Sequence, residues 1–216
     1  MATAKTYPVI IESHGVKLAA DLTIPPKTKR LVIFAHGSGS SRHSPRNQLV
    51  ATHLNQVNIA TLLLDLLTDE EELIDRDSAS YRFDIPLLAK RLLIATQWIK
   101  NELTTLPLSL GYFGASTGAG AALIAAAELP LDIHAVVIRG GRPDLADKSL
   151  AKVRTPVLLV VGGHDEVVIQ LNQQAQQKLC TINKLVIVSG ATHLFSEPGT
   201  LEQVADLAQA WFLQYL

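Results

Sequence analysis

The segment 114–118 reads Gly-Ala-Ser-Thr-Gly and could supply a reactive serine. It follows an apolar run over 108–113 and precedes an Ala- and Gly-rich stretch. The pattern G-x-S-x-G between a strand and a helix is typical of a nucleophile elbow, in which a sharp turn exposes the serine hydroxyl. A structural glycine-rich turn is the alternative, whereas the dinucleotide and phosphate loop patterns do not fit. We predict that Ser116 is a nucleophile.

A serine hydroxyl needs a neighbouring base before it can attack a carbonyl carbon. His193 is our candidate among seven histidines, because it lies just after the last predicted strand, 185–188. Elbow serines are followed along the chain by the acid and then by the histidine, and His193 fits this order. His164 is less well placed, since it directly precedes the candidate acid.

The acid is expected after the preceding strand, 157–161, where the chain reads Gly-Gly-His-Asp-Glu over 162–166. Asp165 and Glu166 both qualify. We favour Asp165, because two glycines let the chain turn sharply and direct one carboxylate back towards the strand end. Glu166 remains the alternative, and a purely local hydrogen-bonding role is common for such aspartates.

Together these side chains predict acyl transfer to serine, with His193 as base and Asp165 fixing the imidazole tautomer. The developing oxyanion would need two donors. One is expected to be the Thr117 N–H, directly after the nucleophile. The other is expected in the glycine-rich loop after the predicted strand 31–35, where we favour the Ser38 N–H and keep Gly37 as the next candidate.

Arginines stand near the same predicted strand ends. Arg139 and Arg142 follow the apolar run 135–138, and Arg42 and Arg46 lie beside the glycine-rich loop. A guanidinium can hold a carboxylate through two parallel hydrogen bonds. We therefore predict that at least one of Arg42, Arg139 and Arg142 binds an anionic group of the substrate. The alternative for each is a solvated or salt-bridged side chain.

The elements that must position these residues are visible in the hydropathy pattern. Alternating segments over 7–12 and 16–24 predict an antiparallel hairpin at a sheet edge. Continuous apolar runs then predict doubly covered strands: 31–35, 60–64, 108–113, 135–138, 157–161 and 185–188. Spacing near 3.6 predicts helices between them: 46–55, 85–101, 117–129, 168–179 and 201–215, with 144–153 as a weaker candidate.

This order predicts an α/β fold with a doubly wound, mostly parallel sheet of about eight strands and helices on both faces. Ligands of such sheets bind at the carboxyl ends of the strands, which is where the candidate residues lie. The acidic stretch from Thr68, running on to Ser80, is expected to be the longest irregular segment, either a solvated loop or a flexible wall over the site. We expect one domain over 1–216.

Bulk properties narrow the function further. A net charge of −1 offers no basic surface for phosphates, so we expect no nucleic-acid partner. One cysteine, Cys180, permits no internal disulfide and fits a reducing compartment. The N-terminal segment has no apolar signal sequence and no run approaches 18 apolar residues, so we expect a cytoplasmic protein without a membrane partner. No H-E-x-x-H spacing occurs, so neither metal nor cofactor is expected.

With these motifs in place, the chain resembles the dienelactone hydrolase-like family of the α/β-hydrolase superfamily. The resemblance extends from about Val16 to Phe212 and rests on the segments 35–47, 114–118, 162–165 and 191–193. It implies the α/β-hydrolase fold and a carboxylic-ester hydrolase acting on a small ester or lactone. Dienelactone hydrolases proper use a cysteine nucleophile, whereas this chain has Ser116 and places Cys180 in a predicted helix.

Larger members of that superfamily insert a lid between the strand carrying Arg139 and the next strand. Here only about 15 residues separate Gly140 from Pro156, which is short for a lid. Two other readings of the same residues stay open. The fold could be a catalytically silent binding module, or the triad could serve an acyltransferase or a non-ester hydrolase.

Overall fold

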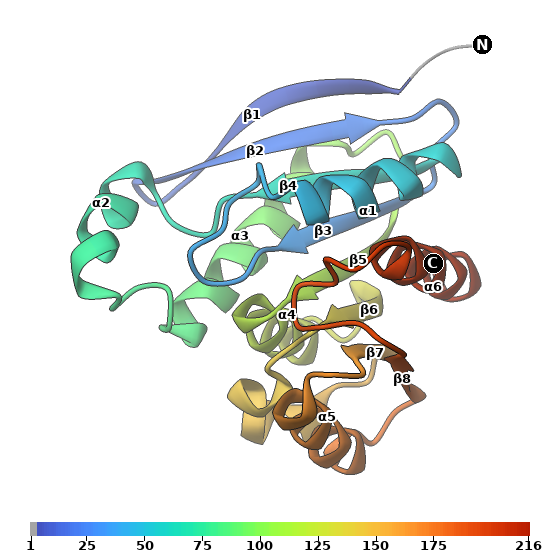
Figure 1. Cartoon of the computed structure of the whole chain (residues 1–216). Helices are drawn as coiled ribbons and strands as arrows, with labels where there is room; N and C mark the ends of the chain where they lie inside the picture. Colours follow the sequence, from blue (N-terminus) through green and yellow to red (C-terminus); the bar gives the residue numbers. More distant parts are fainter. Residues whose placement is uncertain (1–3) are drawn as a thin grey trace.

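The computed structural model describes residues 4–216, in which an eight-stranded sheet runs through the centre of the molecule (Figure 1). The strands are β1 (Lys5–Ser13), β2 (Val16–Ile24), β3 (Arg30–Ala35), β4 (Ile59–Leu64), β5 (Ser109–Ala115), β6 (Ile133–Arg139), β7 (Val157–Gly162) and β8 (Asn183–Val188). Their spatial order is β1-β2-β4-β3-β5-β6-β7-β8. β1 and β2 pair antiparallel at the edge, and β3 to β8 run parallel. The predicted fold class is confirmed.

Helices lie on both faces of the sheet. They are α1 (Pro45–Gln56), α2 (Asp69–Ser78), α3 (Ile85–Glu102), α4 (Thr117–Glu128), the 3₁₀ helix η1 (Pro143–Lys152), α5 (Glu166–Lys178) and α6 (Thr200–Tyr215). α1 and α6 pack together on one face, while α3, α4, η1 and α5 contact one another on the other face (Figure 1). Because β3 to β8 run parallel, their carboxyl ends all lie at one rim of the sheet.

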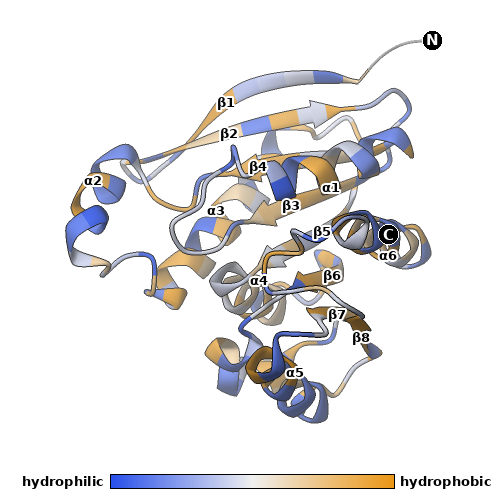
Figure 2. Cartoon of the chain, in the orientation of Figure 1, coloured by the Kyte–Doolittle hydropathy of each residue, from blue (hydrophilic) through white to orange (hydrophobic). Residues whose placement is uncertain are grey.

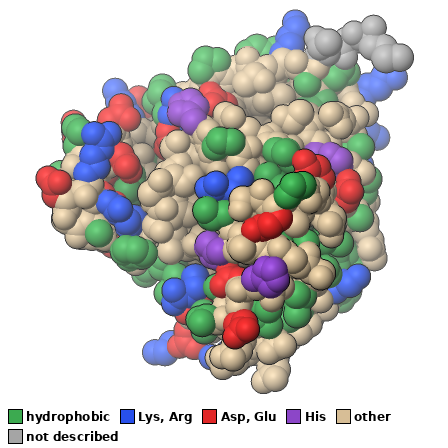
Figure 3. Space-filling view, in the orientation of Figure 1, with side chains coloured by type: hydrophobic (Ala, Val, Ile, Leu, Met, Phe, Trp, Pro, Cys, Tyr) green, Lys and Arg blue, Asp and Glu red, His purple; other side chains and the backbone are tan. Residues whose placement is uncertain are grey.

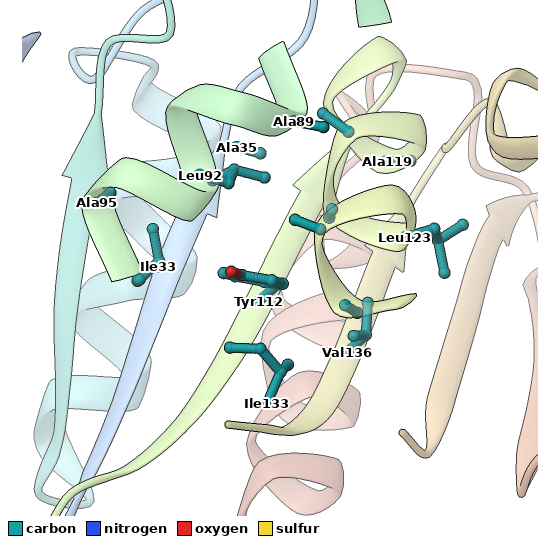
Figure 4. Close-up of a cluster of buried hydrophobic side chains, with 14 of the residues drawn as sticks. Ile33, Ala35, Ala89, Leu92, Ala95, Tyr112, Ala119, Leu123, Ile133 and Val136 are labelled. Carbon is teal, nitrogen blue, oxygen red and sulfur yellow. The ribbon is translucent and has the colours of Figure 1, made fainter. Parts of the chain in front are cut away.

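The core on the α3–α4 face is built from small and branched apolar side chains (Figure 4). Tyr112 is fully buried there, and its hydroxyl lies 2.6 Å from the Thr96 Oγ1 of α3. Burial of an aromatic hydroxyl requires such a partner, because an unpaired polar group in the core costs free energy. Burial also raises the pKa of Tyr112. α3 is thereby fixed against β5, the strand that leads into the candidate nucleophile.

The core on the α1–α6 face is separate and contains most of the large aromatic side chains. Phe34 of β3 stacks on Phe113 of β5 with ring centroids 4.9 Å apart. The alternate residues of each strand thus enter opposite cores, which explains the continuous apolar runs of the central strands (Figure 2). The edge strand β1 differs, because most of its residues are exposed and only Ile11 is buried.

The acidic segment that we predicted to be irregular is largely helical. Thr68 caps α2 through its side chain, which accepts from the Glu71 N–H, while the Glu71 carboxylate accepts from the Thr68 N–H. Four acidic residues in the first turn also suit the positive end of the helix. The prediction failed because α2 buries only Asp75 and has no apolar stripe. The capping box T-x-x-E was the signal for it.

Two smaller expectations also need correction. The weaker helix candidate over 144–153 is a 3₁₀ segment, and the backbone of Asp147 breaks it with a φ of 23°. Cys180 lies beyond the end of α5 and is exposed, rather than inside a helix. Within residues 4–216, no helix has the length and apolar character needed to cross a membrane.

Candidate active site

Ser116 stands at a strained turn between β5 and α4. Its backbone has φ 49° and ψ −119°, a conformation that L-residues rarely adopt and that clusters at functional sites. Two glycines make the turn possible. A Cβ on Gly118 would lie 2.4 Å from the carbonyl oxygens of both Ala35 and His36, and one on Gly37 would lie 2.9 Å from the Ser116 Cβ. The elbow and the β3–α1 loop are therefore in direct backbone contact.

Two hydrogen bonds tie the elbow to the neighbouring strand end. The Ser116 N–H donates to the Arg139 carbonyl (3.3 Å), and the Arg142 N–H donates to the Ser116 carbonyl (3.0 Å). Ser116 is thus held by residues that follow β6 as well as by its own strand. Ser116 as a whole is half-buried and lies at the carboxyl rim of the sheet, where ligands of such sheets bind.

The two predicted oxyanion donors lie side by side. Thr117 begins α4, so its N–H has no partner within the helix. The Ser38 N–H, however, donates to the Thr117 Oγ1 at 2.8 Å. The Ser38 amide thus already has an acceptor in the structure. Gly37 lies against the Ser116 side chain. The oxyanion role of Ser38 stays a prediction, and Gly37 gains weight as the second donor.

His36 fixes the loop that carries these amides. Its Nε2 accepts from the Leu66 N–H (3.1 Å), so the proton must sit on Nδ1, which lies 2.9 Å from the Gly37 carbonyl oxygen. Burial lowers the pKa of His36, which favours this neutral form. His36 therefore joins the β3–α1 loop to the chain after β4.

His193 and Asp165 meet at the same rim. The His193 Nδ1 lies 2.5 Å from the Asp165 Oδ2. The Asp165 side chain is 16% exposed and the His193 side chain 41% exposed, so the pair has a covered acid and an accessible ring. The His164 N–H donates to the Ala191 carbonyl (2.9 Å) and thereby holds the acid-bearing turn against the histidine loop, which we define as residues 189–199.

The histidine loop is braced from within. The Thr192 hydroxyl and N–H both donate to Glu197, at 2.7 and 3.0 Å. The Thr192 side chain, followed by its amide, lowers the pKa of Glu197 to about 2. Phe195, with a φ of 54°, is buried in the α1–α6 core. The loop therefore has one apolar anchor and one polar brace around His193.

Gly140 brings the elbow and the histidine loop together. A Cβ on Gly140 would lie 3.1 Å from the His193 carbonyl oxygen and 3.6 Å from its Nδ1. The preceding carbonyl, that of Arg139, holds the Ser116 N–H. Ser116 and His193 thus flank one strand end. Within the described part of the chain, no hydrogen bond joins the Ser116 hydroxyl to the His193 ring; such bonds often tighten only when substrate is bound.

Comparisons with known proteins identify the family of the chain. The chain superposes on the crystal structure of a dienelactone hydrolase from Anabaena variabilis with a TM-score of 0.97 and 53% identity, over 100% of both chains. The chain belongs to the dienelactone hydrolase-like family of α/β-hydrolases. No family model matches the sequence. An esterase from Pyrococcus furiosus shares the fold (TM-score 0.79, 15% identity, 98% of this chain and 92% of that one).

Two curated Mycobacterium tuberculosis proteins are 57% identical over 208 residues and bear the name "Putative phosphoribosyl transferase". The match covers 96% of this chain and 46% of theirs, so the chain spans about half the length of these relatives. Their name describes the longer protein. The Anabaena dienelactone hydrolase, at 53% identity, supports a hydrolase at the level of the family.

The three arginines predicted to bind substrate have different environments in this dienelactone hydrolase-like chain. Arg42 is ion-paired with Asp65 and lies 3.6 Å from Asp21. Arg142 binds both carboxylate oxygens of Asp144 through Nε and Nη2. Both correspond to the salt-bridged alternative. Arg139 is 8% exposed, and its Nη2 donates to the Asn47 Oδ1 at 3.3 Å.

Sequence reasoning missed two residues that shape this rim in the family fold. Asp65 directly follows β4 and anchors Arg42, so the rule of inspecting strand ends would have found it. Glu197 had no comparable signal, because its partner Thr192 becomes a neighbour only through the loop conformation. Among residues 4–216, no cluster of three or more His, Cys, Asp or Glu side chains is arranged to hold a metal ion. The face in Figure 3 mixes acidic, basic and histidine side chains.

Proposed function

We propose that the chain hydrolyses small carboxylic esters or lactones through Ser116, His193 and Asp165, with an acyl-enzyme intermediate. The observation that carries this proposal is the 2.5 Å contact between the His193 Nδ1 and the Asp165 Oδ2, next to a serine in a strained elbow. The Anabaena neighbour supports the same reaction class, since it is called a dienelactone hydrolase.

In the first step, the Ser116 Oγ attacks the ester carbonyl carbon while the His193 Nε2 takes the hydroxyl proton. Asp165 keeps the other imidazole proton on Nδ1 and stabilises the imidazolium that forms. The negative charge on the carbonyl oxygen would be stabilised by the Thr117 N–H and a second amide from the β3–α1 loop. Losing one such donor typically costs about 100- to 1000-fold in kcat.

Collapse of the tetrahedral intermediate expels the alcohol, which receives the proton from His193. Water then attacks the acyl group on Ser116, with His193 again acting as the base. A cavity of about 510 Å³ lies beside the β3–α1 loop, with polar walls that include Ser40, Ser41 and Asp65. Neither Ser116 nor His193 lines this cavity; a substrate that extends into it from the rim would place a polar group there.

A fluorophosphonate probe and a para-nitrophenyl acetate assay test this proposal. The wild type should be labelled at Ser116 and turn over the ester, and Ser116→Ala should lose labelling and about 10⁴-fold or more in kcat. Cys180→Ser is the matched control, because it removes the exposed thiol and should leave both readouts unchanged. Full activity in Ser116→Ala would refute the nucleophile.

The same reagents separate the alternatives. A silent binding module would show neither labelling nor turnover, and an acyltransferase would pass the acyl group to an added alcohol faster than to water. Phosphoribosyl transfer, which the name of the mycobacterial relatives raises, predicts release of pyrophosphate from a phosphoribosyl donor. We expect no such release from this chain.

A further inference from the structure

Arg46, in the first turn of α1, and Arg139, the last residue of β6, have no carboxylate partner. Within residues 4–216, no acidic side chain lies within 4.0 Å of a guanidinium nitrogen of Arg46 or Arg139, whereas Arg42, Arg82, Arg91 and Arg142 are all ion-paired. The Nε of Arg46 and both the Nε and the Nη1 of Arg139 are buried without a hydrogen-bond partner. Three donor nitrogens of two charged groups are thus buried without a hydrogen-bond acceptor.

Such an arrangement is costly. Arg139 is 8% exposed, and an unpaired buried charge is among the most destabilising groups in a protein. Burial, together with the nearby charge of Arg46, lowers the pKa of Arg139 to about 10. α1 adds a third positive contribution, because its N-terminus points to this region and its first turn contains no acidic residue.

The pair lies beside the reacting groups. The carbonyl of Arg139 accepts the Ser116 N–H. Arg46 lines both the 510 Å³ cavity at the β3–α1 loop and a cavity of about 340 Å³ that Leu194 and Phe195 border, next to His193. A group bound at Arg46 would therefore lie between the β3–α1 loop and the histidine loop.

We propose that Arg46 and Arg139 bind an anionic group of the ester substrate, a carboxylate or a phosphate. This inference rests on the proposed function for the reaction, but the anion site itself stands on the buried, unpartnered guanidinium nitrogens. The anion would accept hydrogen bonds from the guanidinium groups and offset their mutual repulsion. Glu197 and Glu202 also border the 340 Å³ cavity. The Glu197 carboxylate already accepts two hydrogen bonds from Thr192.

Kinetics with matched esters test the proposal. The substrates are para-nitrophenyl hemisuccinate and its uncharged methyl ester, which release the same chromophore. In Arg46→Met and Arg139→Met, kcat/KM for the anionic ester should fall about 10- to 100-fold, as expected for hydrogen bonds to a charged group. The neutral ester should change less than about 3-fold by the same reasoning. Arg154→Met, which removes an exposed arginine, is the control.

Equal losses for both esters, or no loss for either, would overturn the proposal. A purely structural role is excluded by a second readout. Replacing a buried unpaired charge by an apolar side chain of similar length should raise the Tm of Arg139→Met in anion-free buffer. A structural arginine would instead lower the Tm.

Binding can be measured without catalysis. Inorganic phosphate and acetate, added separately to Ser116→Ala, should raise its Tm in proportion to affinity, which also shows which anion is preferred. The shift should vanish in Ser116→Ala combined with Arg46→Met. A shift that persists there would overturn the site. If Ser116→Ala keeps full esterase activity while the shift depends on Arg46, the triad fails and the anion site stands.

Discussion

The serine elbow, residues 114–118, and the histidine loop, residues 189–199, are positioned by different physical means. At the elbow, steric contacts leave no room for another conformation: a Cβ on Gly118 would overlap two carbonyl oxygens. Most of α4 behind it is buried. The histidine loop is largely exposed and depends on Phe195, on the Thr192–Glu197 hydrogen bonds and on the Asp165 contact.

This difference implies that the elbow tolerates substitutions less well than the histidine loop does. The nucleophile is fixed by close packing, in which a single added methyl group is felt. The base is fixed mainly by polar contacts at the surface, which contribute less to stability and adjust more easily. Changes at the elbow should therefore affect folding, whereas changes in the loop should affect the reaction.

Removing the base should have the largest effect and sharpen the contrast. His193→Ala is expected to lower kcat by about 10⁴-fold, because the serine loses its proton acceptor. Its Tm should stay close to that of the wild type, since the ring is 41% exposed. Steady-state kinetics and thermal denaturation check this. His164→Ala is the matched control, and loss of activity there instead would make His164 the base.

A pair of glycine variants compares the two regions directly. Gly118→Ala should destabilise the protein by about 3 kcal/mol or more, because its Cβ would meet two backbone oxygens at 2.4 Å. Gly190→Ala in the histidine loop has open space but a φ of +74°, so it should cost only about 1 kcal/mol. Urea unfolding measures both. Similar losses at the two positions would break the comparison.

The smallest expected effect is the loss, at low pH, of the Thr192–Glu197 hydrogen bonds that brace the histidine loop; we call these bonds the loop brace. The Thr192 bonds hold the pKa of Glu197 at about 2, below the ordinary 4.5. The brace therefore contributes fully above pH 4.5 and is lost as the pH falls towards 2. The amide signal of Thr192 in NMR spectra should follow this titration, and in Glu197→Gln it should not. A midpoint near 4.5 in the wild type would contradict the brace.

The sequence was informative where chemistry follows strand order. Ser116, Asp165 and His193 were each expected directly after a buried strand, and the fold brings the last two into contact. The partners of the arginines were not predictable in the same way. Asp144 is two residues from Arg142 in the sequence, but the environment of Arg139 includes Asn47 of α1, which is 92 residues away along the chain. α2 was missed because its helix is specified by capping rather than by an apolar face.

The exposed thiol of Cys180 offers a practical consequence, since it is the one cysteine in the chain. α5 begins directly after Asp165 and ends two residues before Cys180, and its 13 residues span about 20 Å. A maleimide dye could thus be attached at one defined point of the native sequence. At that separation the fluorophore would leave the rim undisturbed, yet remain within energy-transfer range of a labelled ligand.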